Sequence, residues 1–139
     1  MLFDVWLASR AVTGMLDAAL APTGLTADEF GVYSVLTTTE SMTPSDLAVW
    51  MSAPTTTVSS YVKRLEKRGH LKRHRNPDDG RSFVLRLTPS GRAAHKAAGK
   101  AFHPALQDVL VSLGADEPSV RRALARLRAA VDQRNSDAR

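Results

Sequence analysis

The sequence predicts a mainly α-helical protein that carries one small β-hairpin. Over most of the 139 residues, hydrophobic side chains recur at three- and four-residue intervals, which is the spacing of an amphipathic helix. Residues 70–87 differ. Two short stretches there are separated by the turn sequence NPDDG at residues 76–80, and hydrophobic side chains take alternating positions in the second stretch, a pattern typical of a hairpin. A chain of this length, 43% hydrophobic and 24% charged, is expected to form one compact domain, alone or with a helical appendage.

Two helices are predicted before residue 40. The first covers residues 2–20 and ends at the sequence APTG, which contains both a proline and a glycine. Thr26 and Glu29 have the spacing of a capping box, in which each side chain bonds to the backbone N–H of the other. The second helix is therefore expected from residue 27 to about residue 38.

A pair of short helices is predicted next. Thr43 caps the first of them, Pro44 suits its first helical position, and Asp46 can reach back to the cap. Ser52 is predicted to cap the second, with Pro54 in its first turn, where the missing N–H of proline costs little. The second helix is expected to end at a glycine, residue 69.

The second short helix has two unlike faces. Its predicted inward stripe consists of Val58, Tyr61, Val62 and Leu65. The opposite face carries small hydroxyls first and cations later: Thr56, Thr57, Ser60, Lys63, Arg64 and Lys67. Short side chains at the start of such a helix let it approach base edges in a DNA groove, and cations further along meet phosphates. An ordinary amphipathic helix with a solvated basic face would give the same pattern.

The hairpin follows this helix directly, with expected strands at residues 70–75 and 81–87. A hairpin in this place with an arginine at its tip is a wing, and the narrow minor groove of DNA attracts such an arginine. Residues 63–75 contain a single acid, Glu66, and many more cations. The cations are Lys63, Arg64, Lys67, Arg68, Lys72, Arg73 and Arg75. The net charge of +5 and the isoelectric point near 10.1 also favour a polyanionic partner.

With these motifs the chain resembles the MarR (multiple antibiotic resistance regulator) family of winged helix-turn-helix transcription factors. The resemblance is carried by LAVWMSAPTTTVSSYVKRLEKRGHLKR and, above all, by NPDDGRSFVLRLTPSGR. It implies that Asp79 and Arg81 form the wing pair, with Arg81 entering the minor groove and Asp79 steering it. It also implies a strand-to-helix junction at residues 87–91.

After the hairpin, a long helix is predicted from Pro89 to about residue 113, and Pro104 should kink it or split it in two. A last helix is expected over residues 117–134, with an apolar seam formed by Val120, Leu124, Leu127 and Val131. The terminal helices either pack on the chain's own core or interleave with those of a second copy. The small surface of the central unit favours a homodimer, and the resemblance implies one as well.

The expected organisation is therefore an N-terminal dimerisation helix at 1–24, a winged helix-turn-helix domain at 25–92, C-terminal dimerisation helices at 93–135 and a frayed tail at 136–139.

Several classes of protein are excluded or disfavoured. The absence of cysteine excludes disulfides, thiolate zinc sites and thiol redox sensing. No stretch approaches the roughly 20 apolar residues that span a bilayer, and the N-terminus lacks a signal peptide pattern. We therefore expect no membrane partner and a cytoplasmic location. No phosphate-binding glycine loop, nucleophile elbow or HExxH helix occurs, so neither enzyme activity nor a cofactor is expected.

No metal site is expected within one chain. His70 and His74 would stand roughly 13 Å apart along a strand. His95 and His103 would stand roughly 12 Å apart along a helix. A site shared between two subunits is left open. The aromatic residues Trp6, Phe30, Tyr33 and Trp50 are interpreted as core. The alternative is that they line a pocket for a small-molecule effector, such as the resemblance suggests. The sequence does not decide between the two, so the effector-binding residues stay unknown.

The sequence thus predicts a regulator that binds duplex DNA, and the resemblance implies that it is a repressor, with activation left open. Thr55, Thr56, Thr57 and Ser60 are expected at or near major-groove bases, while Lys63 and Arg64 hold the DNA backbone. Arg75, Asp79 and Arg81 form the wing contact. The alternatives are a winged-helix module that binds an acidic protein and one that binds RNA.

Overall fold

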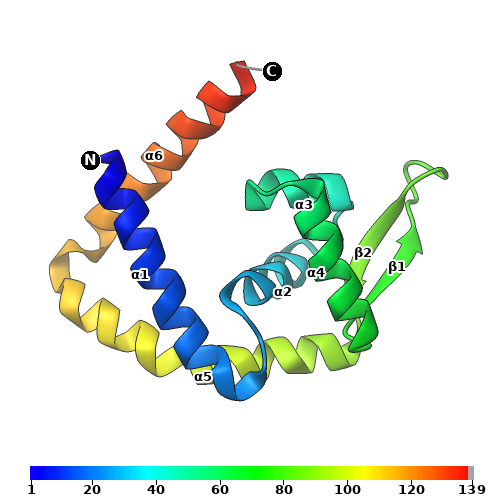
Figure 1. Cartoon of the computed structure of the whole chain (residues 1–139), viewed down its shortest axis with the longest axis horizontal. Coiled ribbons are helices and arrows are strands. Elements are labelled where there is room, and N and C mark those ends of the chain that lie inside the picture. The colour runs from blue at the N-terminus through cyan, green and yellow to red at the C-terminus, as the bar shows by residue number, and fades with distance from the viewer. Residues whose placement is uncertain (138–139) are drawn as a thin grey trace. The chain divides into compact units, whose positions relative to one another are not determined.

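The computed structural model describes residues 1–137, and these form a helical protein with one antiparallel hairpin (Figure 1). The elements are α1 (Leu2–Leu20), η1 (Ala21–Thr23), α2 (Ala27–Thr39), α3 (Pro44–Met51), α4 (Thr55–Lys67), β1 (Leu71–Arg75), β2 (Phe83–Leu87), α5 (Pro89–Leu113), η2 (Gly114–Asp116) and α6 (Glu117–Asp137). The predicted fold class is confirmed. The chain divides into two compact units, Met1–His103 and a second that begins at Pro104.

Local capping fixes the starts of α2 and α3, as predicted. The Thr26 hydroxyl accepts the N–H of Glu29 at 3.2 Å, and the Glu29 carboxylate accepts the N–H of Thr26 at 3.2 Å. The Thr43 hydroxyl accepts the N–H of Asp46 at 3.1 Å, and Pro44 occupies the first helical position. Both helices therefore begin where their first free N–H groups find side-chain oxygens.

The turn between α3 and α4 differs from the prediction. Ser52 does not cap α4; it ends α3 in the left-handed region at φ 50°, and its N–H bonds to the carbonyls of Ala48 and Val49. Pro54 is extended, with ψ 145°, and its carbonyl accepts the N–H groups of Thr57 and Val58, so that α4 begins one residue after Pro54. The prediction was wrong because the backbone of α3, rather than the serine side chain, determines the conformation of Ser52.

The hairpin is shorter at both strand starts than predicted. His70 lies outside β1 because its N–H completes the end of α4 by bonding to the carbonyl of Leu65 at 3.0 Å. Ser82 lies outside β2 because its N–H bonds to the carbonyl of Asp79 within the turn. The register pairs Leu71 with Leu87 and Arg75 with Phe83. Met42 adds a bridge on the other edge of β2, so this strand is central.

One hydrophobic core holds the first unit together. Its largest fully buried residues come from α1, α2, α3, α4 and the hairpin: Leu20, Val32, Tyr33, Leu36, Leu47, Val58, Val62, Leu65, Leu71 and Leu85. The predicted alternation along β2 is incomplete, because Val84 is buried as well as Leu85 and Leu87. The face that carries Val84 also carries the exposed Arg86, so this second face of the strand is covered only at Val84.

The C-terminal helices are longer than predicted. α5 continues through Pro104 as one helix, so the predicted split does not occur, although the two units divide at this residue. α6 runs to Asp137, beyond the predicted end at Arg134. Ser136 and Asp137, predicted to be frayed, are helical, and residues 138–139 lie outside the described part of the chain.

Candidate nucleic-acid interface

α4 exposes the face that the sequence assigns to DNA. Val58, Val62 and Leu65 are at most 2% exposed, and Tyr61 is half-buried. The outward side chains are exposed apart from the half-buried Thr57: Thr55, Thr56, Ser60, Lys63, Arg64 and Lys67. The two faces are therefore arranged as predicted, whereas contact with base edges stays a prediction.

The start of α4 leaves backbone donors available. Pro54 is the N-cap residue, and no side chain caps this helix. The first N–H groups of a helix carry partial positive charge, which favours a negatively charged partner. The hydroxyl of Ser60 donates to the carbonyl of Thr56 at 3.1 Å, which keeps this side chain close to the helix surface. A flat, hydroxyl-bearing surface with unpaired amides at its start suits close approach to a groove.

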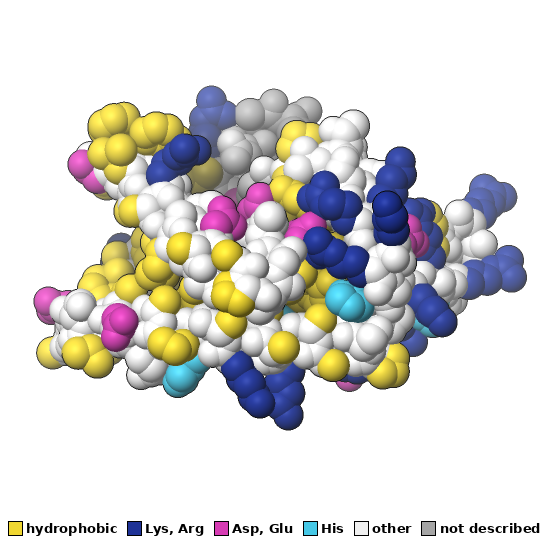
Figure 2. All heavy atoms as spheres, turned by 60° about the horizontal axis from the view of Figure 1, so that its bottom comes forward, with side chains coloured by type: hydrophobic (Ala, Val, Ile, Leu, Met, Phe, Trp, Pro, Cys, Tyr) yellow, Lys and Arg dark blue, Asp and Glu magenta, His cyan; other side chains and the backbone are white. Residues whose placement is uncertain are grey.

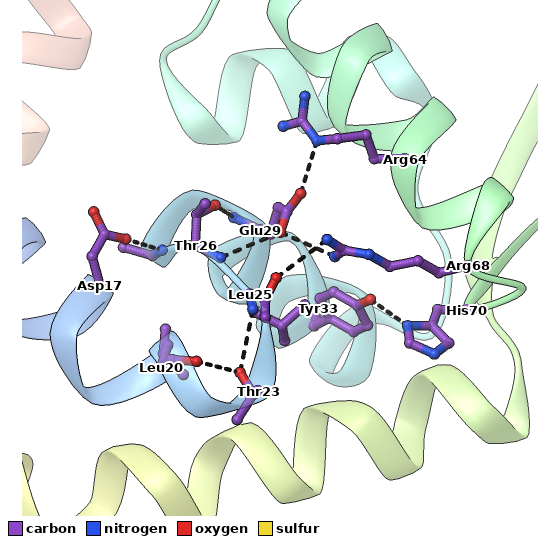
Figure 3. Close-up of polar contacts among 12 residues, drawn as sticks. Asp17, Leu20, Thr23, Leu25, Thr26, Glu29, Tyr33, Arg64, Arg68 and His70 are labelled. Atoms are coloured by element: carbon purple, nitrogen blue, oxygen red, sulfur yellow. Dashed lines mark hydrogen bonds and ion pairs between the residues drawn. The ribbon is translucent and has the colours of Figure 1, made fainter.

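A buried carboxylate anchors α4 to α2 (Figure 3). Glu29 is 2% exposed and accepts hydrogen bonds from two arginines of the α4 region. The Arg64 Nε donates to Glu29 Oε1 at 2.8 Å, and the Arg68 Nη1 donates to Glu29 Oε2 at 3.1 Å. Arg68 also donates to the carbonyl of Gly24 at 3.2 Å. We call Glu29, Arg64 and Arg68 the Glu29 cluster; it fixes the angle at which α4 leaves the core.

The Glu29 cluster holds its carboxylate in the charged form. Burial alone raises the pKa of Glu29, but hydrogen bonds from Arg64, Arg68 and the N–H of Thr26 outweigh it, so that the pKa lies below its usual value. A buried charge that is fully hydrogen-bonded is stable, whereas one that loses a partner is costly. Glu29 therefore depends on both arginines.

Two tyrosines add further contacts, one between α2 and the middle of α4 and one between α2 and the residues that follow α4. The Tyr61 hydroxyl donates to Asp28 Oδ2 at 2.7 Å, and this bond to a carboxylate raises the pKa of Tyr61 to about 12. Tyr33 is buried, and its hydroxyl lies 2.6 Å from the Nδ1 of His70 (Figure 3). Burial raises the pKa of Tyr33. α4 is thus bound to α2 near its middle and at its C-terminal end.

Arg64 has an intramolecular role that the sequence did not indicate. Its guanidinium bonds to Glu29 and lies 4.9 Å from the centre of the Tyr61 ring. Lys63, by contrast, has no hydrogen bond or ion pair within residues 1–137. Of the two cations predicted to hold the DNA backbone, Lys63 is free to do so, whereas Arg64 must share its donors.

The tip of the hairpin is a folded turn. The Asp79 carboxylate accepts the backbone N–H of Arg81 at 3.1 Å, and Asn76 Nδ2 donates to the hydroxyl of Ser82 at 2.9 Å. Arg75 Nε donates to the carbonyl of Gly80 at 3.3 Å. Asp79 therefore acts on the backbone of Arg81 rather than on its guanidinium, and the Arg81 side chain is exposed. Figure 2 shows Lys and Arg side chains on the right-hand side, where α4 and the hairpin lie.

Not all cations of this segment face outward. Arg73 Nε donates to Glu66 Oε1 at 2.7 Å, and its guanidinium stacks on the Phe83 ring at 4.5 Å. The carboxylate of Glu66 raises the pKa of Arg73. This pair fastens β1 to α4. Sequence reasoning missed the bonds of Glu29 to the arginines of the α4 region and the pairing of Glu66 with Arg73, because these partners are identified only by the fold.

A close backbone contact joins the end of α4 to the start of α5. The Thr88 hydroxyl donates to the carbonyl of Gly69 at 2.7 Å, and the Thr88 N–H donates to the carbonyl of His70 at 3.0 Å. A Cβ on Gly91 would lie 2.0 Å from the same His70 oxygen. Only glycine allows this approach, which explains the predicted junction in physical terms.

The aromatic residues separate into two groups. Tyr33 and Phe30 belong to the core, as expected, and Phe30 packs on Phe102 and on the half-buried His95. Burial lowers the pKa of His95. Trp6 and Trp50 are 54% and 40% exposed in the single chain, so the core interpretation is wrong for these two. Residues 1–137 contain no group of three or more His, Asp or Glu side chains that could hold a metal ion.

No helix within residues 1–137 has both the length and the hydrophobicity that crossing a bilayer requires.

Comparison with known proteins places this arrangement in a family. Residues 23–82 match the model of the MarR family. The chain is 31% identical to an HTH-type transcriptional repressor of Mycobacterium bovis over 102 residues, which is 73% of either chain. It is 28% identical to the HTH-type regulator YdgJ of Bacillus subtilis over 97 residues, covering 70% of this chain and 59% of YdgJ.

Among solved structures, the chain resembles the Mycobacterium tuberculosis regulator MosR in complex with DNA, with a TM-score of 0.80 and 29% identity. The match covers 95% of this chain and 96% of MosR. By its sequence and its fold, the chain belongs to the MarR family of winged helix-turn-helix transcriptional regulators.

Proposed function

We propose that the protein binds duplex DNA as a homodimer and represses transcription from a pseudo-palindromic operator. The observation that carries the proposal is the exposed face of α4, with small hydroxyls and open amides at its start and free cations further along. The arginine-bearing hairpin stands next to it on the same compact unit. The likeness to MosR, which was solved with DNA, supports the same conclusion.

In this proposal, Thr55, Thr56, Thr57 and Ser60 lie at the floor of the major groove. Lys63 contacts a phosphate with its free ammonium group, and Arg64 contributes only the donors that Glu29 leaves unused. Arg81 enters the minor groove at the hairpin tip, where the electrostatic potential is most negative. Arg75 and Asp79 keep the tip in shape through their bonds to the backbone of Gly80 and Arg81.

The terminal helices supply the proposed dimer contact. α1 exposes a run of apolar side chains in the single chain: Leu2, Phe3, Trp6, Leu7 and Val12. Those on α6 are Val120, Leu124 and Val131. Exposed apolar surface of this extent favours association with another chain. The proposed division is thus a dimerisation helix at 1–24, the DNA-binding domain at 25–92 and dimerisation helices at 93–135.

A two-fold dimer makes a geometric prediction about its operator. Two copies of α4 reach successive major grooves when their half-sites are about 34–36 Å apart, so that the operator has inverted symmetry. A small-molecule effector would act by binding more tightly to the dimer when its two α4 helices have one spacing than when they have another. Because its ligand is chromosomal DNA, the protein acts in the cytoplasm, as a binding protein and not as an enzyme.

The test is selection of bound duplexes from a random library, followed by fluorescence anisotropy on the selected site. We expect an inverted repeat, preferred over scrambled duplex and over RNA. Arg81→Ala should weaken binding by about 1–3 kcal/mol at fixed salt, while Arg126→Ala, which removes an exposed arginine from α6, should not. Recovery of no common duplex sequence, or better binding to RNA, would refute the proposal and favour the RNA- or protein-binding alternative.

A further inference from the structure

A second charged region lies at the base of the hairpin, on the face that α4 does not cover. It is a groove of about 610 Å³ between the C-terminal end of α2, the two strands and the first turn of α5. Arg73 on β1 points to α4, where it bonds to Glu66, so strand alternation directs its neighbours Lys72 and His74 to the other face. The groove is therefore separate from the exposed surface of α4.

Cations of like charge lie side by side on the face of the hairpin that lines this groove. Lys72 and Arg86 occupy directly opposed positions of the antiparallel pair. Neither has an ion pair within residues 1–137, although both line the groove. Like charges in opposed positions destabilise a hairpin. The fold therefore retains an unfavourable pair at a place where an anion would relieve it.

A third cation and one acid complete the lining. Arg92, in the first turn of α5, is held in place by a hydrogen bond from its Nη1 to the carbonyl of Leu87 at 2.9 Å. Glu40, which also lines the groove, is in a strained γ-turn, with φ 63° and a bond from the Ser41 N–H to the carbonyl of Thr39. Lys72, Arg86 and Arg92 exceed this single carboxylate by two positive charges. The unbalanced charge matches a dianion.

The remaining lining is apolar or carries hydroxyls. The apolar residues are Leu36, Leu87 and Pro89, and the hydroxyls belong to Thr37 and Thr88. The volume is within the range of sites for small molecules, roughly 300–1,000 Å³. Its half-apolar wall favours an organic body over a bare inorganic ion, and a concave surface of this size suits a small molecule better than the convex DNA backbone.

We propose that this groove binds a small organic dianion of the phosphate monoester class, with Lys72 and Arg86 on the phosphate and the organic part against Leu36 and Pro89. Such a ligand would bridge α2, the hairpin and α5. The site does not require the protein to bind DNA, so its test is independent of the operator.

The experiment is isothermal titration of the full-length protein, without DNA, with phenyl phosphate. Phenol and inorganic phosphate are titrated as the two halves of the probe. We expect saturable binding of one phenyl phosphate per chain and weaker binding of either half. Lys72→Gln and Arg86→Gln should each reduce the affinity about tenfold or more, because each removes a charged hydrogen bond. Lys96→Gln, which removes an exposed lysine of α5 outside the groove, should leave the affinity unchanged.

Both groove variants should fold, since each removes a repulsion; unfolding temperatures equal to or above that of the wild type check this. Absence of saturable phenyl phosphate binding would overturn the proposal, as would an equal loss in Lys96→Gln. Equal affinity for inorganic phosphate would overturn the organic part of the assignment. Loss of DNA affinity in Lys72→Gln and Arg86→Gln, with no phenyl phosphate binding by the wild type, would assign these cations to the DNA interface instead.

Discussion

Glu29 carries its charge inside the protein because three donors compensate for the lost water. Its pKa is lower in the folded chain than its ordinary value of 4.5, so the folded state favours the carboxylate. A group with a lowered pKa contributes stability above the unfolded value, and this contribution is lost as the pH falls through the folded value. The cluster should therefore stabilise the protein at neutral pH and fail in acid.

Replacing Glu29 tests this reasoning. Glu29→Gln should lower the free energy of unfolding at pH 7 by about 2–4 kcal/mol, because two arginines lose a charged acceptor. Below pH 4.5 the difference from the wild type should shrink as the wild-type carboxylate becomes protonated. Urea unfolding at several pH values measures both effects. Glu117→Gln, which removes a surface ion pair with Arg121, should change stability by less than about 1 kcal/mol. A difference that stays constant with pH would contradict this account of Glu29.

Lys63 and Arg64 are adjacent and carry the same charge, but of the two only Arg64 is bonded to another side chain within residues 1–137. Lys63→Ala should weaken binding to all DNA sequences about equally and lower the slope of log affinity against log salt by about one. It should leave the unfolding free energy within about 0.5 kcal/mol of the wild type. Arg64→Ala should also destabilise the fold, since it removes a partner of Glu29. Anisotropy at several salt concentrations, paired with urea unfolding, separates the two; a loss confined to one base pair would make Lys63 a base reader.

At the scale of elements, the starts of helices were the most predictable features. Thr26 and Thr43 cap α2 and α3 through bonds to residues three positions away, so the signal lies entirely in the local sequence. The conformation of Ser52 depends instead on carbonyls of the preceding helix, and propensity alone favoured the wrong role. The predictable boundaries are thus those that a single side chain determines.

The candidate site divides in the same way. The outward position of Thr56, Ser60 and Lys63 follows from helical periodicity and was predicted. The bonds of Arg64 to Glu29 and of Arg73 to Glu66 join separate elements, and no spacing in the sequence indicates them. Periodicity gives the direction of a side chain, but only the fold gives its partner.

The junction between the hairpin and α5 has a sharp steric requirement. Gly91→Ala should lower the free energy of unfolding by about 1–3 kcal/mol, because its Cβ would meet the backbone oxygen of His70 at 2.0 Å, and neither backbone can move freely. Gly99→Ala on the same helix is the matched control. No atom lies within 4 Å of its Cβ, so this change should raise stability by about 0.5–1 kcal/mol. Equal effects of the two variants would rule out the contact as the cause.

At the scale of the whole molecule, the proposed dimer covers the exposed apolar residues of α1 and α6 with a second copy of the chain. Hydrophobic side chains gather on the left of Figure 2, the side on which α1 begins. Leu124 is 54% exposed in the single chain, so its replacement removes nothing from the chain's own core. A charge at this position should act on association alone.

Leu124→Lys should therefore dissociate the dimer while the helical content stays that of the wild type, because a desolvated ammonium in an apolar interface is costly. Sedimentation equilibrium measures the association constant, and circular dichroism measures the helicity. Ala129→Lys adds the same charge on the other side of α6, about 140° from Leu124, and should leave the dimer intact. A dimer unaffected by Leu124→Lys would place the interface elsewhere.

Arg64 is bonded to Glu29, and its proposed contact with DNA would have a consequence for proton uptake. If an operator phosphate draws the guanidinium away from Glu29, the carboxylate loses its strongest partner and its affinity for a proton rises. Binding to DNA and protonation of Glu29 then promote each other, by the reciprocity that governs any two coupled ligands. The complex would take up protons as it forms, and mild acid would strengthen it, in contrast to the acid sensitivity of the free fold.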